Sequence, residues 1–224
     1  MNKKLLRLFL CLTLVTVFAT LGLAADKTRP SGVTTTVTRQ ARPQVDPFAG
    51  VKKLFSNLGP DPTDLYDASN GWLVAGHFNV YNGQKQDVAI PFRSPANASI
   101  VGVRLPLQWY GYGANQATVA IYSDAGGAPG SAIAHKDLKN FDSFGSGCCN
   151  LASWKLATPV PVTKGTTYWV VATTNNASKD SVSVWDLIYN DAPGIWAYQQ
   201  DDGGWIVTTA SDGYALPAVA VYGQ

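Results

Sequence analysis

Glutamate is absent from this 224-residue chain, so all fifteen acidic residues are aspartates. Glutamate is a good helix former, whereas aspartate prefers turns and caps, so this bias is unfavourable to a mainly helical protein. Only 14% of the residues are charged and 46% are hydrophobic. That balance excludes intrinsic disorder, which requires low hydrophobicity and high net charge. Charged heptads and a glycine triplet repeat are also missing, which excludes a coiled coil and a collagen.

The basic residues are unevenly distributed along the chain. Residues 25–59 hold six basic and two acidic residues, whereas residues 60–224 hold eight basic and thirteen acidic ones. An acidic body lacks the positive surface on which nucleic-acid binding depends, so we predict no nucleic-acid partner. The basic segment could contact an acidic surface, but we interpret it as a solvated spacer.

The first 24 residues have the pattern of a secretory signal peptide. Lys3, Lys4 and Arg7 supply a positive start, and residues 5–23 are otherwise apolar, without an aspartate. Small residues at the end of this apolar run favour cleavage by a signal peptidase after Ala24. An uncleaved membrane anchor is the other interpretation, because about 19 apolar residues can just span a bilayer. We expect a secreted or cell-surface protein with no membrane span after cleavage.

Residues 25–59 show no clear hydrophobic period, and three prolines interrupt any regular element. Residues 48–55 could form a brief amphipathic helix, which Gly50 weakens. We predict a mostly disordered linker over residues 25–59, followed by one domain over residues 60–224.

Short β-prone runs separated by turn residues begin after residue 66. Residues 117–123 and 181–185 alternate between two faces, as strands do. Asp201-Asp202-Gly203-Gly204 predicts a hairpin, in which glycine supplies the positive φ of a tight turn. Many short strands at this spacing predict an all-β antiparallel β-sandwich or jelly roll. The candidate strands are 72–81, 86–93, 98–109, 117–123, 131–138, 153–157, 167–174, 181–189, 194–199, 204–208 and 215–222.

Three segments resemble one family of bacterial exported proteins. Residues 121–131, IYSDAGGAPGS, resemble the strand–turn–strand signature I-Y-x-D-x-G-x-P-G of choice-of-anchor type domains. Residues 162–171, VTKGTTYWVV, resemble their L-x-x-G-T-x-Y-W element, and residues 215–223 resemble their last strand. The resemblance implies a jelly-roll-like sandwich similar to carbohydrate-binding modules. Such turn and core motifs specify a fold, which does not by itself imply a function.

Cys148 and Cys149 are adjacent, and they are the only cysteines left once residues 1–24 are removed. In an oxidising compartment they can close a vicinal disulfide, which the flanking glycines allow. We interpret this bridge as a local loop staple. A rigid apolar ring for ligand stacking and a redox switch are the other interpretations. The spacing of two cysteines and two distant histidines does not match a zinc site.

Calcium is the one metal that the aspartates suggest. Asp61, Asp64 and Asp67 place three carboxylates within seven residues, and Asp124 lies in the first predicted hairpin. Calcium prefers such oxygen ligands in loops, although the run lacks the glycine and glutamate of an EF-hand. A solvated acidic turn explains the same residues, so a structural calcium ion and an ordinary turn both remain open.

Aromatic residues carry the functional prediction, because seven tryptophans and ten tyrosines exceed what a small core requires. Their flat apolar faces and polar tips suit stacking on sugar rings. Trp72, Trp154, Trp169 and Trp185 lie in apolar strands, and we place them in the core. Two other clusters are candidate glycan platforms, although core packing and cross-strand pairing explain them equally well. These clusters are Trp109, Tyr110 and Tyr112 in a glycine-rich loop, and Trp196, Tyr198 and Trp205 around the predicted hairpin.

Catalytic constellations are missing from the sequence. His77 and His135 are the two histidines, and neither lies in a recognisable catalytic motif. We therefore predict a secreted, non-catalytic module that binds envelope or environmental glycan. A structural or adhesive surface protein that contacts other proteins is the second hypothesis. A glycoside hydrolase is the third, and it requires two facing aspartates in a cleft.

Overall fold

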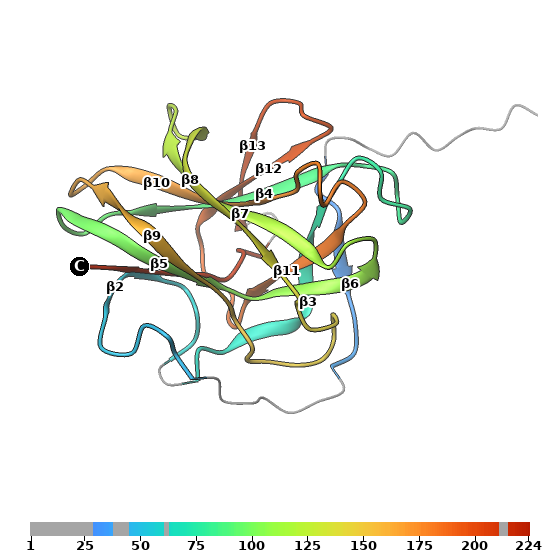
Figure 1. Ribbon diagram of the computed structural model, residues 1–224, viewed down its shortest axis with the longest axis horizontal. Coiled ribbons are helices and arrows are strands. Elements are labelled where there is room, and N and C mark those ends of the chain that lie inside the picture. The colour runs from blue at the N-terminus through green and yellow to red at the C-terminus, as the bar shows by residue number, and fades with distance from the viewer. Residues whose placement is uncertain (1–28, 38–44, 61–62, 211–214) are drawn as a thin grey trace, which may run out of the picture.

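The computed structural model describes residues 29–37, 45–60, 63–210 and 215–224, whose strands form two antiparallel sheets (Figure 1). The predicted β-sandwich is confirmed. Residues 1–24 lie outside the described residues, as do residues 25–28 and 38–44 of the predicted linker. The strands are β1 (Gly32–Thr34), β2 (Lys52–Ser56), β3 (Tyr66–Ala75), β4 (Gln86–Arg93), β5 (Ala98–Leu105), β6 (Leu107–Tyr112), β7 (Gln116–Asp124), β8 (Pro129–Lys139), β9 (Ala152–Val162), β10 (Thr167–Thr173), β11 (Val182–Ile188), β12 (Ile195–Gln200), β13 (Ile206–Thr209) and β14 (Ala220–Gly223).

The larger sheet, sheet A, follows the order β6-β11-β3-β4-β10-β7-β8, with β1 added to β3, β12 to β4 and β13 to β12. The smaller sheet, sheet B, has the order β2-β14-β5-β9. The last strand, β14, therefore lies inside sheet B, and the chain ends beside β2 and β5 (Figure 1). No helix in the described part of the chain has the length and apolar character that a membrane crossing needs.

Pro106 divides what the sequence predicted as one strand over residues 98–109. β5 pairs with β14 and β9 in sheet B, whereas β6 pairs with β11 in sheet A. Proline has no N–H to donate to a ladder, so it suits a corner at which the chain changes sheets. The predicted strand over residues 72–81 also ends early, because β3 stops at Ala75.

A single asparagine organises the loop over residues 76–84 that replaces the end of that predicted strand. The Asn79 side-chain nitrogen donates to the carbonyls of Gly76 (2.6 Å) and Gln84 (3.0 Å). Its oxygen accepts the backbone N–H groups of Asn82 (3.0 Å) and Gly83 (3.2 Å). Asparagine side chains commonly replace backbone partners in this way. The loop consequently holds a fixed shape while its apolar side chains stay exposed.

Two strands lie in the segment that the sequence assigned to a linker, so its described part is a correction to that prediction. β1 pairs with β3, and β2 pairs with β14. Phe48 is buried and stacks on Tyr222, with ring centroids 4.6 Å apart. The predicted helix over residues 48–55 is also wrong, because residues 52–56 form β2. A long-range partner, β14, stabilises this strand, and no local sequence pattern reports such a partner.

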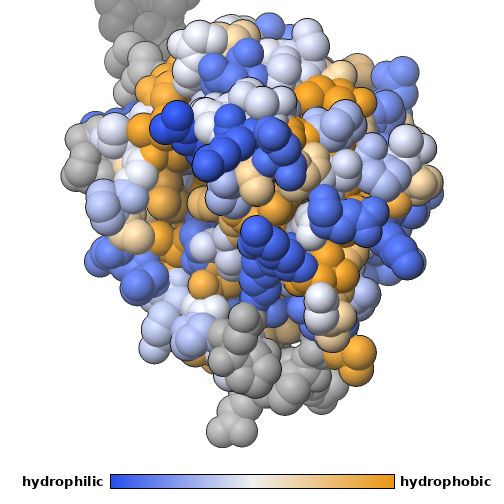
Figure 2. All heavy atoms as spheres, turned by 90° about the vertical axis from the view of Figure 1, so that its left-hand side faces the viewer, coloured by the Kyte–Doolittle hydropathy of each residue, from blue (hydrophilic) through white to orange (hydrophobic). Residues whose placement is uncertain are grey.

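Both faces of sheet A carry buried apolar side chains. On β10, Val170 belongs to the main core between the sheets, whereas Trp169 and Val171 belong to a second cluster on the outer face. A third cluster, around Leu73 and Val184, covers the outer face of β3 and β11. On the face of the molecule in Figure 2, apolar areas are interrupted by hydrophilic side chains. Five tryptophans are buried, namely the four predicted core residues 72, 154, 169 and 185, together with Trp196.

Arg104 on β5 is a buried cation whose neighbours tie three segments together. It is 1% exposed, and its Nη1 lies 2.9 Å from an oxygen of Asp64 and 3.2 Å from an oxygen of Asp46. Lys53 on β2 makes a further ion pair with Asp64, at 3.0 Å. A buried charge needs such partners, because removing it from water is costly.

The Arg104–Asp64 pair yields a test of stability. We expect Asp64→Ala to lower the free energy of unfolding by about 3–5 kcal/mol, because it weakens the pairing of a buried guanidinium. The double variant Asp64→Leu/Arg104→Met removes both charges and should lose less than half as much. Denaturant unfolding measures the free energy of unfolding of both variants. An Asp64→Ala variant as stable as the wild type would contradict the stabilising role of the Arg104–Asp64 pair.

Candidate functional site

A bulge at the end of β6 separates the aromatic rings of residues 109–112, which belong to this strand and not to the loop that the sequence predicts. β11 pairs Val182 with Tyr112 but Ser183 with Trp109, so Tyr110 and Gly111 are extra residues on β6. Gly111 has a φ of 96°, a conformation that favours glycine. Bulges redirect side chains, and this one sends neighbouring rings to different places.

Each ring of this first predicted cluster has its own environment. Trp109 is half-buried against the main core, and its indole N–H donates to the Tyr112 carbonyl at 3.1 Å. Tyr110 packs on the outer-face cluster of β3 and β11. Tyr112 is 39% exposed. The sequence argument that adjacent rings cannot all point inward is therefore confirmed, but Trp109 acts as a support rather than as the leading platform.

Tyr81 from the loop over residues 76–84 completes a surface group that we call the tyrosine patch: Tyr81, Tyr110 and Tyr112. The ring centroid of Tyr81 lies 4.9 Å from that of Tyr110 and 5.6 Å from that of Tyr112, and the centroids of Tyr110 and Tyr112 lie 5.9 Å apart. Tyr81 is 41% exposed. The sequence pattern does not reveal Tyr81 as a site residue, because it predicts Tyr81 at the end of the strand over residues 72–81 rather than in a loop.

The tyrosine patch contains no aspartate, lysine, arginine or histidine. A hydrogen bond with the Tyr81 side chain, together with burial, raises the pKa of Tyr110 to about 12. The patch therefore presents flat apolar rings and hydroxyl groups, a combination that suits polar but uncharged ligands.

The second predicted platform is wrong. Trp196 is fully buried and stacks on Trp72 with centroids 4.6 Å apart, while Tyr198 is 2% exposed. Trp205 is half-buried and packs over the outer-face cluster that contains Trp169. These rings fill the two sides of sheet A, so they offer no shared outward face.

The hairpin between β12 and β13 forms as predicted, but its backbone differs from the prediction. Asp201 and Asp202 take the positive φ values, 48° and 56°, where glycine was expected to do so. The carboxylate of Asp202 pairs with Lys85 and lies 2.6 Å from Nε2 of His77. Lys85 also lies 3.4 Å from Asp87. Asp87 and Asp202 therefore share Lys85 in one ion-pair network, which braces the hairpin.

Cys148 and Cys149 form the predicted vicinal disulfide, across a cis peptide bond. Cys149 is buried in the main core, and Cys148 is half-buried against it. Beside them, Gln108 donates to the Gly147 carbonyl at 3.3 Å and accepts the Gly145 N–H at 2.9 Å. The ring therefore contributes to packing beneath its loop, as a staple does, and presents little surface for ligand stacking.

The candidate calcium ligands have other partners. Asp64 pairs with Arg104 and Lys53, and Asp67 accepts hydrogen bonds from Ser69 and Asn70 of its own strand, β3. Asp61 lies outside the described residues. In the ranges that the structure covers, no three histidine, cysteine or aspartate residues gather as a metal site would require.

Asp124 links the two segments that resemble exported domains. One of its oxygens accepts the indole N–H of Trp169 at 2.8 Å, and the other accepts the Gly127 N–H at 3.0 Å. Trp169 is fully buried in the outer-face cluster. The aspartate of the first motif therefore orients the tryptophan of the second.

Asp186 on β11 is a buried carboxyl group with an unusual environment. It is 0% exposed, and neither of its oxygens has a hydrogen-bond partner among the described residues. Burial, and secondarily the charge of Asp67, raises the pKa of Asp186 well above its ordinary value. Because no solvent reaches it, a ligand cannot contact this carboxyl group in the folded state.

The role of Asp124 gives a test that separates a structural carboxylate from a calcium ligand. We expect Asp124→Ala to lower the free energy of unfolding by about 1–3 kcal/mol, because it leaves the Trp169 indole N–H without an acceptor. Asp124→Asn retains an acceptor oxygen, so its free energy of unfolding should fall by less. Thermal unfolding should show the same loss of stability for Asp124→Ala in calcium buffer and in chelator. A loss seen only in calcium buffer would instead identify Asp124 as a calcium ligand.

The raised pKa of Asp186 predicts that replacing this residue stabilises the protein by an amount that depends on pH. The folded state holds a proton that the unfolded chain releases near pH 4, so this residue lowers stability progressively as the pH rises above about 4. Asp186→Asn is neutral and similar in shape. Its melting temperature should match the wild type at about pH 4 and exceed it by several degrees at about pH 8. Equal or lower melting temperatures at both pH values would contradict this explanation.

No family model matches this chain, and no curated protein sequence matches it either. The resemblance to choice-of-anchor type domains thus stays a prediction that rests on the quoted segments, while the structure establishes an antiparallel sandwich.

Proposed function

We propose that this protein is an exported, non-catalytic module that binds glycan through the tyrosine patch. The observation that carries the proposal is the meeting at the surface of Tyr81, from the loop over residues 76–84, with Tyr110 and Tyr112, from the bulged end of β6. Residues 1–24, with the pattern of a signal peptide, and the resemblance to bacterial choice-of-anchor domains support a location outside the cell.

The chemistry of the patch suits sugar rings. Tyr81 and Tyr112 are 41% and 39% exposed, so their rings are accessible to the C–H face of a pyranose. Their hydroxyl groups can donate and accept hydrogen bonds. Rigid segments reduce the entropy that binding must overcome. Here Asn79 holds the loop over residues 76–84, and the Trp109–Tyr112 hydrogen bond holds the end of β6. Because the patch is small and open, weak affinity is expected.

Contact with another protein is a second candidate function. Phe78 and Val80, in the same loop as Tyr81, are 66% and 79% exposed. Exposed apolar side chains in a fixed loop are typical of protein interaction sites. An adhesive or structural surface protein would use them together with the patch.

A paired set of variants tests the glycan proposal. Tyr81→Ala/Tyr112→Ala should weaken binding on a glycan array by roughly tenfold, equivalent to about 1.4 kcal/mol of lost stacking. Tyr189→Ala is the matched control, because Tyr189 is 60% exposed and makes no ring contact with the patch residues. Equal binding by the double variant and the control would overturn the site. If Phe78→Ser/Val80→Ser abolishes capture of a protein partner while glycan signal is absent, the second candidate is favoured.

A further inference from the structure

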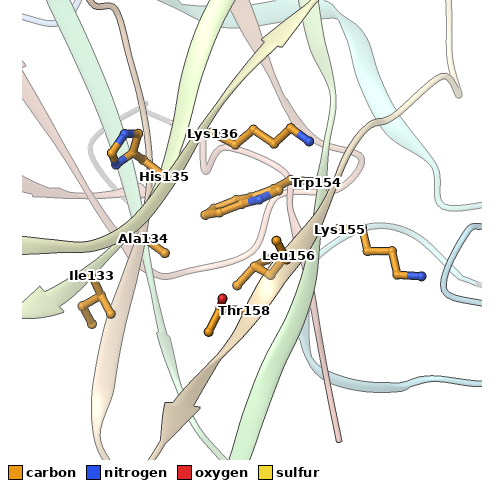
Figure 3. A pocket seen from close by; sticks show the side chains of 9 residues that line it. Ile133, Ala134, His135, Lys136, Trp154, Lys155, Leu156 and Thr158 are labelled. Carbon is orange, nitrogen blue, oxygen red and sulfur yellow. The ribbon is translucent and has the colours of Figure 1, made fainter.

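The seam between the two end strands of the sandwich is a second surface with a defined chemistry. β8 ends sheet A and β9 ends sheet B, and in the described ranges each pairs along one side only. Between them lies a hollow of about 370 Å³. Figure 3 shows Ala134, Lys136, Trp154, Leu156 and Thr158 between the two strands, whereas His135 and Lys155 point away from the hollow.

The unpaired backbone of β8 is the first feature that a partner could use. An end strand presents N–H and C=O groups that another extended chain can pair with. β9 is blocked over part of its length, because Pro159 and Pro161 carry no N–H. β8 runs for 11 residues, and proline occurs in it only at its first position, Pro129. The receptive edge is therefore that of β8.

The charge of the seam is opposite to that of the rest of the body. β8 and β9 together carry three lysines and one aspartate, whereas the remainder of residues 60–224 carries five basic and twelve acidic residues. Lys136 lies in the hollow itself and is exposed. An acidic partner is thus attracted to this seam and repelled by the surrounding surface.

The lining favours a peptide over a sugar. Trp154 is 4% exposed, so its ring presents almost no face for stacking. Leu156 and Ala134 make the hollow apolar beside the exposed lysine. Side chains of an added strand alternate between the hollow face, which Lys136 shares, and the opposite face, where Ile133 is 46% exposed. A strand whose alternate residues are acidic and apolar can therefore direct its carboxylates to Lys136 and its apolar side chains to Ile133.

We propose that the β8–β9 seam binds an extended acidic segment of another protein, which adds as a strand to the edge of β8. This surface and the tyrosine patch involve different residues, so the proposal stands independently of glycan binding.

Fluorescence anisotropy with a labelled peptide tests the proposal directly. The probe is a peptide of about nine residues in which valine and aspartate alternate, long enough to pair along β8. We expect Lys136→Glu to weaken binding by about tenfold and the control Lys164→Glu, outside the seam, by less than about twofold. Thr158→Phe should also weaken binding, because it fills the hollow from an exposed position. Circular dichroism confirms that each variant is folded.

A second probe separates strand addition from simple charge attraction. The same peptide N-methylated at alternate residues keeps its charge but loses backbone donors, and we expect it not to bind. Equal binding of the methylated peptide, or equal losses for Lys136→Glu and Lys164→Glu, would overturn the proposal. So would a doubled mass in light scattering that Lys136→Glu abolishes, since the seam would then join two copies. The proposal would also be overturned if the seam bound a uronic-acid oligomer but not the peptide, and if Thr158→Phe weakened that binding.

Discussion

Burial of both faces of sheet A is the constraint on which the rest of this structure depends. Sheet B covers one face, and the other carries its own apolar clusters around Trp169 and around Val184. A sheet that is apolar on both sides needs far more large side chains than a sheet with one solvated face. This requirement explains why the chain contains so many tryptophans, and it weakens the argument that the surplus exists to bind ligands.

Because the faces of sheet A are covered, the accessible chemistry lies in loops and at edges. The tyrosine patch arises where a bulge in β6 meets the loop that Asn79 organises. The seam arises where the end strands of the two sheets approach each other without pairing. One surface presents flat rings and hydroxyl groups, and the other presents an apolar hollow beside lysine. The two therefore suit ligands of different chemical classes.

Buried polar groups show how the same interior treats charge in two ways. Arg104 is surrounded by carboxylates from other segments, so its charge is compensated and it fixes the entry of the chain into sheet B. Asp186 has no such partner among the described residues, so protonation is the means by which the fold accommodates it. Charge compensation depends on which segments meet, which local sequence does not reveal.

The sequence by itself determined the fold class, because strand periodicity and turn residues are local properties. It also located the four core tryptophans and the cysteine pair, since apolar flanks and adjacency are visible in the chain. Tertiary structure alone decided that Trp196 stacks on Trp72, that β2 is a strand, that Asp124 holds Trp169, and that Tyr81 joins Tyr110. Each of these depends on a contact between residues far apart in the chain. Burial and partner choice are properties of the packed sheets, and the linear pattern cannot specify them.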